Sequence, residues 1–238
     1  MERIPKINEA FELFESVIND AIDSSTPDDI LIRSYFSIVE ILIKSTCTGK
    51  YATKFSEFFY VRYVKKYLET HLEKFDFTEE AIKGRSSPRF AALYKGKKVI
   101  LSSDIPIQSA GISESPDIFV GIEKENGIIH PIAIFEIKLH QDKSQLATLI
   151  KRFLKMRDDF ANKFSGDELP YFVWLYLRYE KYLKQDYEEE IAQFKSLSKN
   201  NLIVVNEITE WTINSYKSNI KGGINSILKK IVRKIEIF

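Results

Sequence analysis

The chain has 238 residues, of which 44% are hydrophobic and 13% aromatic, and its formal net charge is +1. This composition predicts one folded globular domain and excludes a disordered chain. The near-neutral charge excludes a protein that binds nucleic acid through its overall charge, so a nucleic-acid partner would need a local basic patch. The single cysteine excludes an internal disulfide and a cysteine-based zinc cluster. We see no signal peptide and no apolar run long enough to cross a membrane, so we expect a cytoplasmic protein.

The first third of the chain is expected to be helical. Apolar residues recur at steps of three and four residues between positions 7 and 22, which is the pattern of an amphipathic helix. The sequence T-P-D-D at 26–29 is a helix start signal, and it predicts a second helix that ends near residue 45. A third helix is expected over 51–75. Residues 1–80 thus form a helical N-terminal part.

A basic segment follows, and we interpret it as a connector. No acidic residue occurs between Ala81 and Ser103, whereas lysine and arginine recur. This pattern indicates either a solvated surface or a patch that faces DNA phosphates, and the sequence alone leaves both open. The candidate DNA-binding residues are Lys83, Arg85, Arg89, Lys95, Lys97 and Lys98.

The middle of the chain carries the patterns of β-strands. We expect strands at 98–104, 117–122 and 132–139, the last two joined through Asn126-Gly127, the dipeptide typical of two-residue hairpin turns. Alternating helices and buried strands follow, at 144–164, 171–177, 188–197 and 201–206, and a basic amphipathic helix at 224–235 ends the chain. The order predicts an α/β fold: a mixed central sheet flanked by helices, in which an antiparallel hairpin joins parallel strands.

Two charges interrupt the second hairpin strand, in I-F-E-I-K-L. A two-residue turn would pair positions whose numbers sum to 253, which places Asp117 directly opposite Glu136 with Cβ atoms about 5 Å apart. Strand alternation then puts Asp117, Glu136 and Lys138 on one face. Pro131 cannot donate to the ladder, so it marks a bulge or a longer loop. A slip of one residue would move Asp117 to the other face.

Two carboxylates this close repel each other unless one is protonated or a cation lies between them. Hard oxygen ligands suit Mg²⁺, which in proteins takes one or two carboxylates together with water and phosphate oxygens. The cluster therefore predicts phosphodiester hydrolysis, in which stabilisation of charge supplies most of the catalysis. The alternative is a cross-strand ion pair with a structural role alone.

The segment S-P-D-I-F-V-G, the hairpin and then F-E-I-K-L resembles the PD-(D/E)xK nuclease superfamily, the fold of most type II restriction endonucleases. The matching motif is Pro116-Asp117 and Glu136-Ile137-Lys138, and the order of elements is similar over residues 50–206. The resemblance implies a single nuclease domain over 1–238. Its catalytic core would be 90–206, a restriction endonuclease-like core, with a helical C-terminal extension at 207–238.

The resemblance also implies roles for these residues. The side chains of Asp117 and Glu136 and the backbone carbonyl of Ile137 would bind Mg²⁺. Lys138 would position or help to deprotonate the attacking water and stabilise the charge on the phosphorane. Many family members add an acidic residue from a helix before the hairpin, and Glu57 is the candidate here, although a solvated helix glutamate is at least as consistent with its sequence context.

The activity implied is that of a Mg²⁺-dependent endonuclease that cuts double-stranded DNA, of the type II restriction kind. Such enzymes are typically homodimers, because a palindromic site has the two-fold symmetry of the dimer. Gln145 matches some exonuclease-like members, but those have a tyrosine four residues later, where this chain has Leu149. Two alternatives remain open: a repair, junction-resolving or defence nuclease without sequence specificity, and a non-catalytic nucleic-acid-binding or assembly module.

Overall fold

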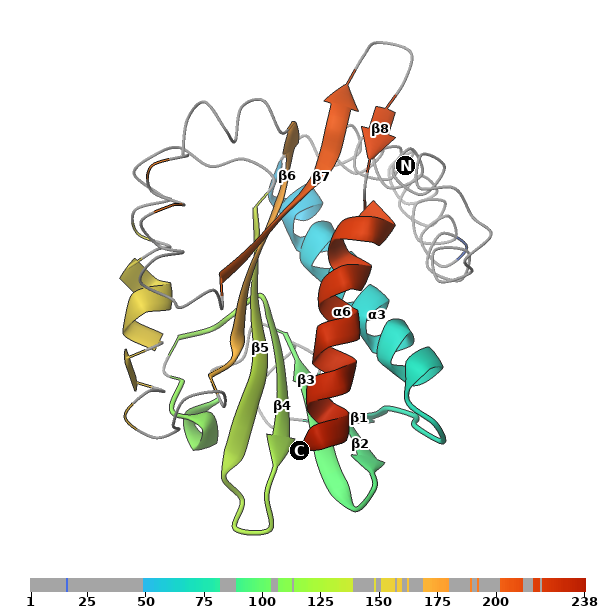
Figure 1. Ribbon diagram of the computed structural model, residues 1–238, viewed down its shortest axis with the longest axis vertical. Coiled ribbons are helices and arrows are strands. Elements are labelled where there is room, and N and C mark those ends of the chain that lie inside the picture. The colour runs from blue at the N-terminus through green and yellow to red at the C-terminus, as the bar shows by residue number, and fades with distance from the viewer. Residues whose placement is uncertain are drawn as a thin grey trace, which may run out of the picture.

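A computed structural model describes residues 16, 49–81, 89–103, 107–112, 114–138, 148, 151–156, 158–159, 162, 169–179, 189, 192, 202–211, 216–218 and 220–238. Among these residues, the helices with defined bounds are α3 (Gly49–His71) and α6 (Ile220–Ile237), with a short 3-10 helix, η1 (Gln108–Ala110). The strands are β1 (Thr78–Glu80), β2 (Arg89–Tyr94), β3 (Lys97–Ser102), β4 (Ile118–Glu123), β5 (Ile129–Lys138), β6 (Tyr171–Tyr179), β7 (Leu202–Trp211) and β8 (Tyr216–Ser218). Figure 1 shows their arrangement.

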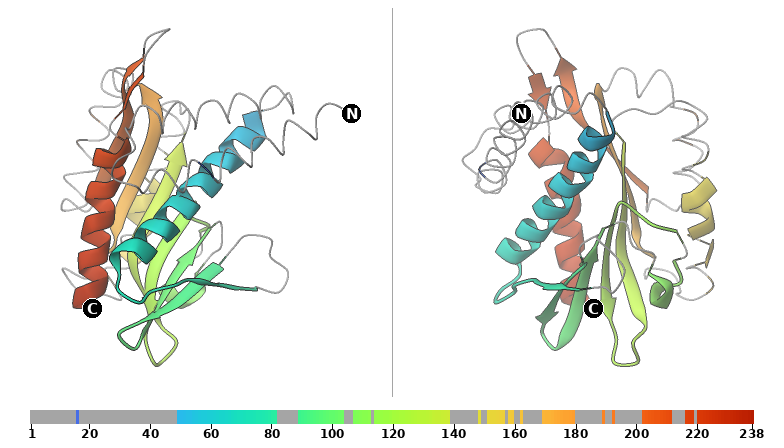
Figure 2. Two further views of the ribbon diagram at one scale, coloured as in Figure 1. Left: turned by 90° about the vertical axis from the view of Figure 1, so that its right-hand side faces the viewer. Right: turned by 180° about the vertical axis from the view of Figure 1, so that it is seen from behind.

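The strands form one eight-stranded sheet whose spatial order is the chain order, β1 to β8. Neighbours from β1 to β5 are antiparallel, β5, β6 and β7 are parallel, and β8 returns antiparallel to β7. This confirms the predicted mixed sheet, with an antiparallel hairpin that leads into parallel strands. Helices α3 and α6 cover one side of the sheet, and the helical residues 151–156 lie on the other side (Figure 2).

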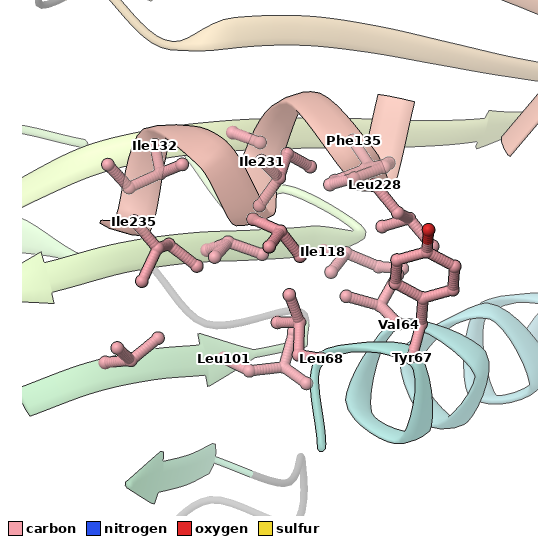
Figure 3. Packing of buried hydrophobic residues seen from close by; sticks show 14 of the residues in the cluster. Val64, Tyr67, Leu68, Leu101, Ile118, Ile132, Phe135, Leu228, Ile231 and Ile235 are labelled. Carbon is pink, nitrogen blue, oxygen red and sulfur yellow. The ribbon is translucent and has the colours of Figure 1, made fainter. Parts of the chain in front are cut away.

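The larger core lies between the sheet and α3 with α6. Both helices present apolar residues at steps of three and four positions, such as Leu228, Ile231 and Ile235 of α6, and all three are buried. Figure 3 shows these side chains directed toward Ile118 and Phe135 of the central strands. A hydrogen bond of 2.7 Å from Tyr63 Oη to Asn225 Oδ1 joins the two helices.

A second apolar contact covers the opposite face of the sheet. The rings of Phe153, from the helical residues 151–156, and Phe172 of β6 lie 5.4 Å apart, and both are buried. Phe172 is aligned in register with Ile134 of β5, so these two side chains share a face. Glu136 alternates onto the same face, two residues beyond Ile134, which places it beside this helical segment.

Several predicted boundaries change in the structure. The third expected helix is α3, which begins at Gly49 and ends at His71, and α6 includes Gly222 and Gly223 rather than following them. The first two expected helices lie outside the described residues, apart from the helical Ser16. Strand β7 is longer than expected, and β8 was not predicted. In the part of the chain that the structure describes, no helix is both long enough and apolar enough to cross a membrane.

The interpretation of the basic segment as a connector is wrong for residues 89–98. Arg89–Tyr94 forms β2, which turns at Lys95-Gly96 and pairs with β3 along six residue pairs from Arg89 with Ser102 to Tyr94 with Lys97. Lys95 and Gly96 both have positive φ, 50° and 79°, as a two-residue hairpin turn requires. Most of β2 is buried, with Leu93 as its exposed residue, so the strand lacks the alternation of apolar and polar residues by which a half-buried strand is recognised.

Candidate active site

The hairpin between β4 and β5 turns through three residues instead of the expected two. The Lys124 N–H donates to Ile128 O at 2.9 Å, and the Gly127 N–H donates to Lys124 O at 2.9 Å. Gly127 has a φ of 74°, which favours glycine, and Asn126 Oδ1 accepts the Ile128 N–H at 3.1 Å. The prediction of a two-residue turn at Asn126-Gly127 is therefore wrong. Near the turn, the numbers of paired residues sum to 252 instead of the expected 253.

A bulge in β5 restores the predicted register. Gly121 pairs with Pro131, but Val120 pairs with Ala133, so Ile132 is the extra residue. From there the positions again sum to 253, and Ile118 pairs with Phe135. The expected bulge near Pro131 is thus confirmed. The longer turn and the bulge each shift the register by one residue and cancel, which brings Asp117 to the level of Glu136.

Asp117 lies directly before β4, and its carboxylate lies against the backbone of the E-I-K triplet. The Ile137 N–H donates to Asp117 Oδ2 at 2.6 Å, a short distance typical of a bond to a charged acceptor. The two residues are twenty positions apart in the chain. The hairpin therefore brings together the two halves of the predicted motif, Pro116-Asp117 and Glu136-Ile137-Lys138.

Glu136 is 1% exposed, and a burial this deep requires a partner for its charge. Arg152 supplies one: its Nη2 lies 3.1 Å from Glu136 Oε1, and its Nη1 donates to Oε2 at 3.5 Å. Arg152 Nη2 also donates to Ser115 O at 3.4 Å, two residues before Asp117. The guanidinium therefore links Glu136 to the segment that enters β4.

The sequence reasoning missed Arg152, although a signal was present. Apolar residues at 149, 153 and 156 define the buried side of the expected helix, and an arginine at 152 falls on that same side. A charged residue on an apolar stripe predicts a buried partner. Outside this pair, Glu114 Oε2 lies 3.5 Å from Arg152 Nε, and Glu114 Oε1 lies 3.8 Å from Lys155 Nζ. The contacts that lead outward from Glu136 therefore alternate between acidic and basic side chains.

Lys138 and Glu57 are the remaining candidate catalytic residues. The backbone of Lys138 ends β5 opposite Tyr176, but its side chain lies outside the described part of the chain. Glu57 is buried, so the alternative of a solvated helix glutamate is wrong. It precedes Val64 by two helical turns, on the side of α3 that packs against the sheet. Because α3 and residues 151–156 cover opposite faces, Glu57 and Arg152 approach the sheet from different sides (Figure 1).

The sheet pairs part of the basic segment with acids from neighbouring strands. Lys98 Nζ lies 2.8 Å from Glu80 Oε1 and 3.3 Å from Glu123 Oε2. The hydrogen bond with Glu80 is the largest cause that raises the pKa of Lys98 above its ordinary value. Arg89 contacts the same two carboxylates, at 3.0 and 3.8 Å. The expected excess of positive charge is therefore neutralised at Arg89 and Lys98 by residues that are distant in sequence.

The other members of the predicted DNA-binding set stay candidates. The Lys95 Nζ lies 5.0 Å from the centre of the Tyr94 ring, at the tip of the β2–β3 hairpin. Lys97 begins β3 and is partly exposed. Lys83 and Arg85 lie outside the described residues. Contact of these four residues with DNA remains a prediction.

The donor chemistry of Asp117 and Glu136 fits Mg²⁺, which takes one or two protein carboxylates and completes its shell with water. Within the described ranges, no group of three or more His, Cys, Asp or Glu side chains is arranged to hold a metal ion. The ion pair with Arg152 means that a divalent cation would share the Glu136 carboxylate with a guanidinium.

Comparisons with protein-family models, with curated proteins and with solved structures found no match.

Proposed function

We propose that this protein is a Mg²⁺-dependent DNA endonuclease with a restriction endonuclease-like core, whose site is built from Asp117, Glu136 and Lys138. The observation that carries the proposal is the 2.6 Å hydrogen bond from the Ile137 N–H to Asp117 Oδ2. It brings the aspartate of the Pro-Asp strand against the Glu-x-Lys strand, as hydrolysis by a PD-(D/E)xK site requires.

The topology supports the same proposal. The antiparallel hairpin β4–β5 leads into the parallel strands β6 and β7, and the helical residues 151–156 fall in the connection from β5 to β6. This is the order of elements that the resemblance implies for the nuclease core. The helical N-terminal part is supported by α3 within the described residues.

The resemblance implies a role for each of these residues. Asp117, Glu136 and the Ile137 carbonyl would hold Mg²⁺. Bound there, Mg²⁺ would supply positive charge that offsets the charge building up on the phosphate during hydrolysis. Lys138, whose backbone lies at the end of the same strand, would position the attacking water and stabilise charge on the phosphorane. Arg152 is a positioning residue, because it contacts Glu136 and fixes the direction of its carboxylate.

Length and fold favour an enzyme that both reads and cuts double-stranded DNA, so we extend the proposal to a site-specific type II restriction endonuclease acting as a homodimer. The test is incubation of phage DNA with the protein and Mg²⁺, with and without a chelator. Discrete fragments that disappear with the chelator support this activity. A smear, or preferred cutting of branched DNA, would instead indicate a repair, junction-resolving or defence nuclease.

One observation favours a second candidate, a non-catalytic nucleic-acid-binding or assembly module. The ion pair with Arg152 gives Glu136 a partner that a purely structural carboxylate would also need. The variant Lys138→Ala separates the two candidates, because it removes the ammonium without touching this pair. If no divalent metal supports cleavage, and Lys138→Ala behaves as the wild type in every assay, only the non-catalytic module remains.

A further inference from the structure

The turn between β4 and β5 and the C-terminal end of α6 lie at the same end of the sheet (Figure 1). Residues from both elements line a basic pocket. Its volume is about 830 Å³. The residues that line it are Lys124, Tyr171, Lys230, Arg233, Lys234, Ile237 and Phe238. The pocket thus joins four cationic side chains with two aromatic rings and an isoleucine, and within the described ranges no Asp or Glu side chain lines it.

The cations from α6 share one side of that helix. Lys230, Arg233, Lys234 and Ile237 follow one another at steps of three, one and three residues, which aligns them along one helical stripe. Glu236 lies off this stripe, at the edge of the face that Arg233 occupies. Lys124 approaches from the hairpin turn, so the pocket is positively charged from two elements that are distant in sequence.

Three of the four cations lack a carboxylate partner within the described part of the chain. Among the residues that the structure describes, no carboxylate forms an ion pair with Lys124, Lys230 or Arg233. Lys234 is held in place, because its Nζ donates to Leu169 O at 2.5 Å and lies 5.2 Å from the centre of the Tyr171 ring. A concave site with several cations that lack acidic partners attracts an anion that carries more than one charge.

The apolar part of the pocket indicates that this anion has an aromatic or apolar body. Ile237 is 85% exposed, whereas the apolar residues of α6 from Ile224 to Ile235 are buried. Phe238 lies beside it, and its ring contacts the buried His130 ring at a centroid distance of 4.3 Å. The neighbouring Tyr171 is partly exposed. Flat aromatic ligands stack on such surfaces.

The pocket is separate from the candidate active site. Tyr171, which lines the pocket, is aligned with Ala133 of β5. Glu136 lies three residues further along β5, roughly 10 Å at about 3.3 Å per residue, and strand alternation directs its side chain to the opposite face of the sheet. Moreover, α6 covers the face of the sheet opposite to that of the helical residues 151–156, which include Arg152 (Figure 2). A ligand in the pocket therefore does not contact Asp117 or Glu136.

We propose that this pocket is a binding site for the phosphate groups of a nucleotide, either free or at the end of a nucleic-acid strand, distinct from the site of hydrolysis. Lys124, Lys230, Arg233 and Lys234 bind the phosphates, and Ile237 and Phe238 pack against the base. The proposal does not depend on the nuclease activity, because it uses none of the residues of that site.

The test is isothermal titration calorimetry without divalent metal, with three probes: ATP, inorganic pyrophosphate, and a short single-stranded oligonucleotide with or without a 5′-phosphate. ATP binding tighter than pyrophosphate supports both the phosphate and the base contacts. Binding that depends on the 5′-phosphate of the oligonucleotide, with weak binding of ATP, places the ligand at a strand end. We expect Lys230→Gln and Arg233→Gln each to weaken binding about tenfold, because each loses a charge-assisted contact.

The matched control is Lys229→Gln, which removes the same charge one residue away from an exposed position that does not line the pocket. We expect it to leave the affinity within about twofold. If Lys229→Gln weakens binding as much as Lys230→Gln, the effect belongs to the general charge of α6 and the proposal is wrong. Binding of none of the three probes by the wild type also overturns it. Because Glu136→Gln leaves the pocket intact, its nucleotide affinity should equal that of the wild type even if cleavage is lost.

Discussion

Replacing Arg152 by methionine tests how the buried carboxylate is stabilised. Glu136 is 1% exposed and meets both outer nitrogens of the guanidinium, at 3.1 and 3.5 Å. Removing one partner of a fully buried ion pair costs about 3–5 kcal/mol, because the remaining charge is left without compensation. The Arg152 side chain is 28% exposed, so water reaches part of the vacated space. We therefore expect Arg152→Met to lower the free energy of unfolding by about 2–3 kcal/mol.

The assay is urea unfolding followed by circular dichroism, with the variants Arg152→Met, Glu136→Gln and the double variant. If the two side chains act as a pair, the double variant loses less stability than the sum of the single variants, by about 1–2 kcal/mol. The matched control is Lys155→Met in the same helical segment. Its side chain is 61% exposed and lies 3.8 Å from Glu114, so its effect should stay within about 0.5 kcal/mol.

Two results would refute this reasoning. The first is an Arg152→Met variant as stable as Lys155→Met, which would mean that water or another group compensates Glu136. The second is strict additivity of the Arg152 and Glu136 variants, which would mean that the two side chains contribute independently.

Two further predictions concern the sheet. In Gly121→Ala, the new Cβ would lie 2.7 Å from Phe119 Cζ and 2.8 Å from Ile129 Cγ2. We therefore expect this variant to lower the free energy of unfolding, measured in urea, by about 1–3 kcal/mol. A variant as stable as the wild type would contradict the bulge geometry. The pKa of Lys98 is raised above its ordinary value of 10.5, so the stability it contributes is present below pH 10.5 and is lost as the pH rises through the raised value. Thermal unfolding of Lys98→Met should lack that loss above pH 10.5, and a decline equal to that of the wild type would show that other groups cause it.

The sequence predicted the central strands and their directions well. The strands 117–122, 132–139 and 171–177 are each dominated by apolar residues, and burial on both faces leaves few other arrangements for such runs. The assumption of a two-residue turn placed Asp117 opposite Glu136, and this result is correct although the assumption is not. The turn holds one residue more than Asn126-Gly127 indicates, and the bulge at Ile132 compensates for it.

The sequence does not show that the extra residue of the turn and the bulge in β5 cancel each other. A proline in a strand indicates an irregularity, yet it does not say whether a residue is added to the strand or to the turn. Strand β2 was missed for a different reason. The strand begins at Arg89 and is followed directly by Lys95, and the charges of these two residues suggest an exposed connector. The acids that pair with Arg89 come from β1 and from the end of β4.

The environment of Glu136 also lay beyond prediction from the sequence. The pattern of the hairpin shows which residues share a face, but it does not show which helix covers that face. Arg152 reaches Glu136 only because the segment after β5 folds back over the sheet, with Phe153 packed against Phe172. A contact of this kind depends on the connection between two parallel strands, whose path no local pattern determines.

The most direct test of the proposed nuclease site is the rate of DNA cleavage by Asp117→Asn with excess enzyme and Mg²⁺. Its matched control is Glu125→Gln, an exposed carboxylate in the hairpin turn, and circular dichroism of both variants establishes that they are folded. We predict that Asp117→Asn cleaves at least about 10²–10³-fold more slowly than the wild type, because a carboxylate ligand of the proposed Mg²⁺ is lost and the metal's positive charge is what stabilises the reacting phosphate. Glu125→Gln should cleave at the rate of the wild type. A folded Asp117→Asn variant that retains the rate of the wild type would contradict the proposed site.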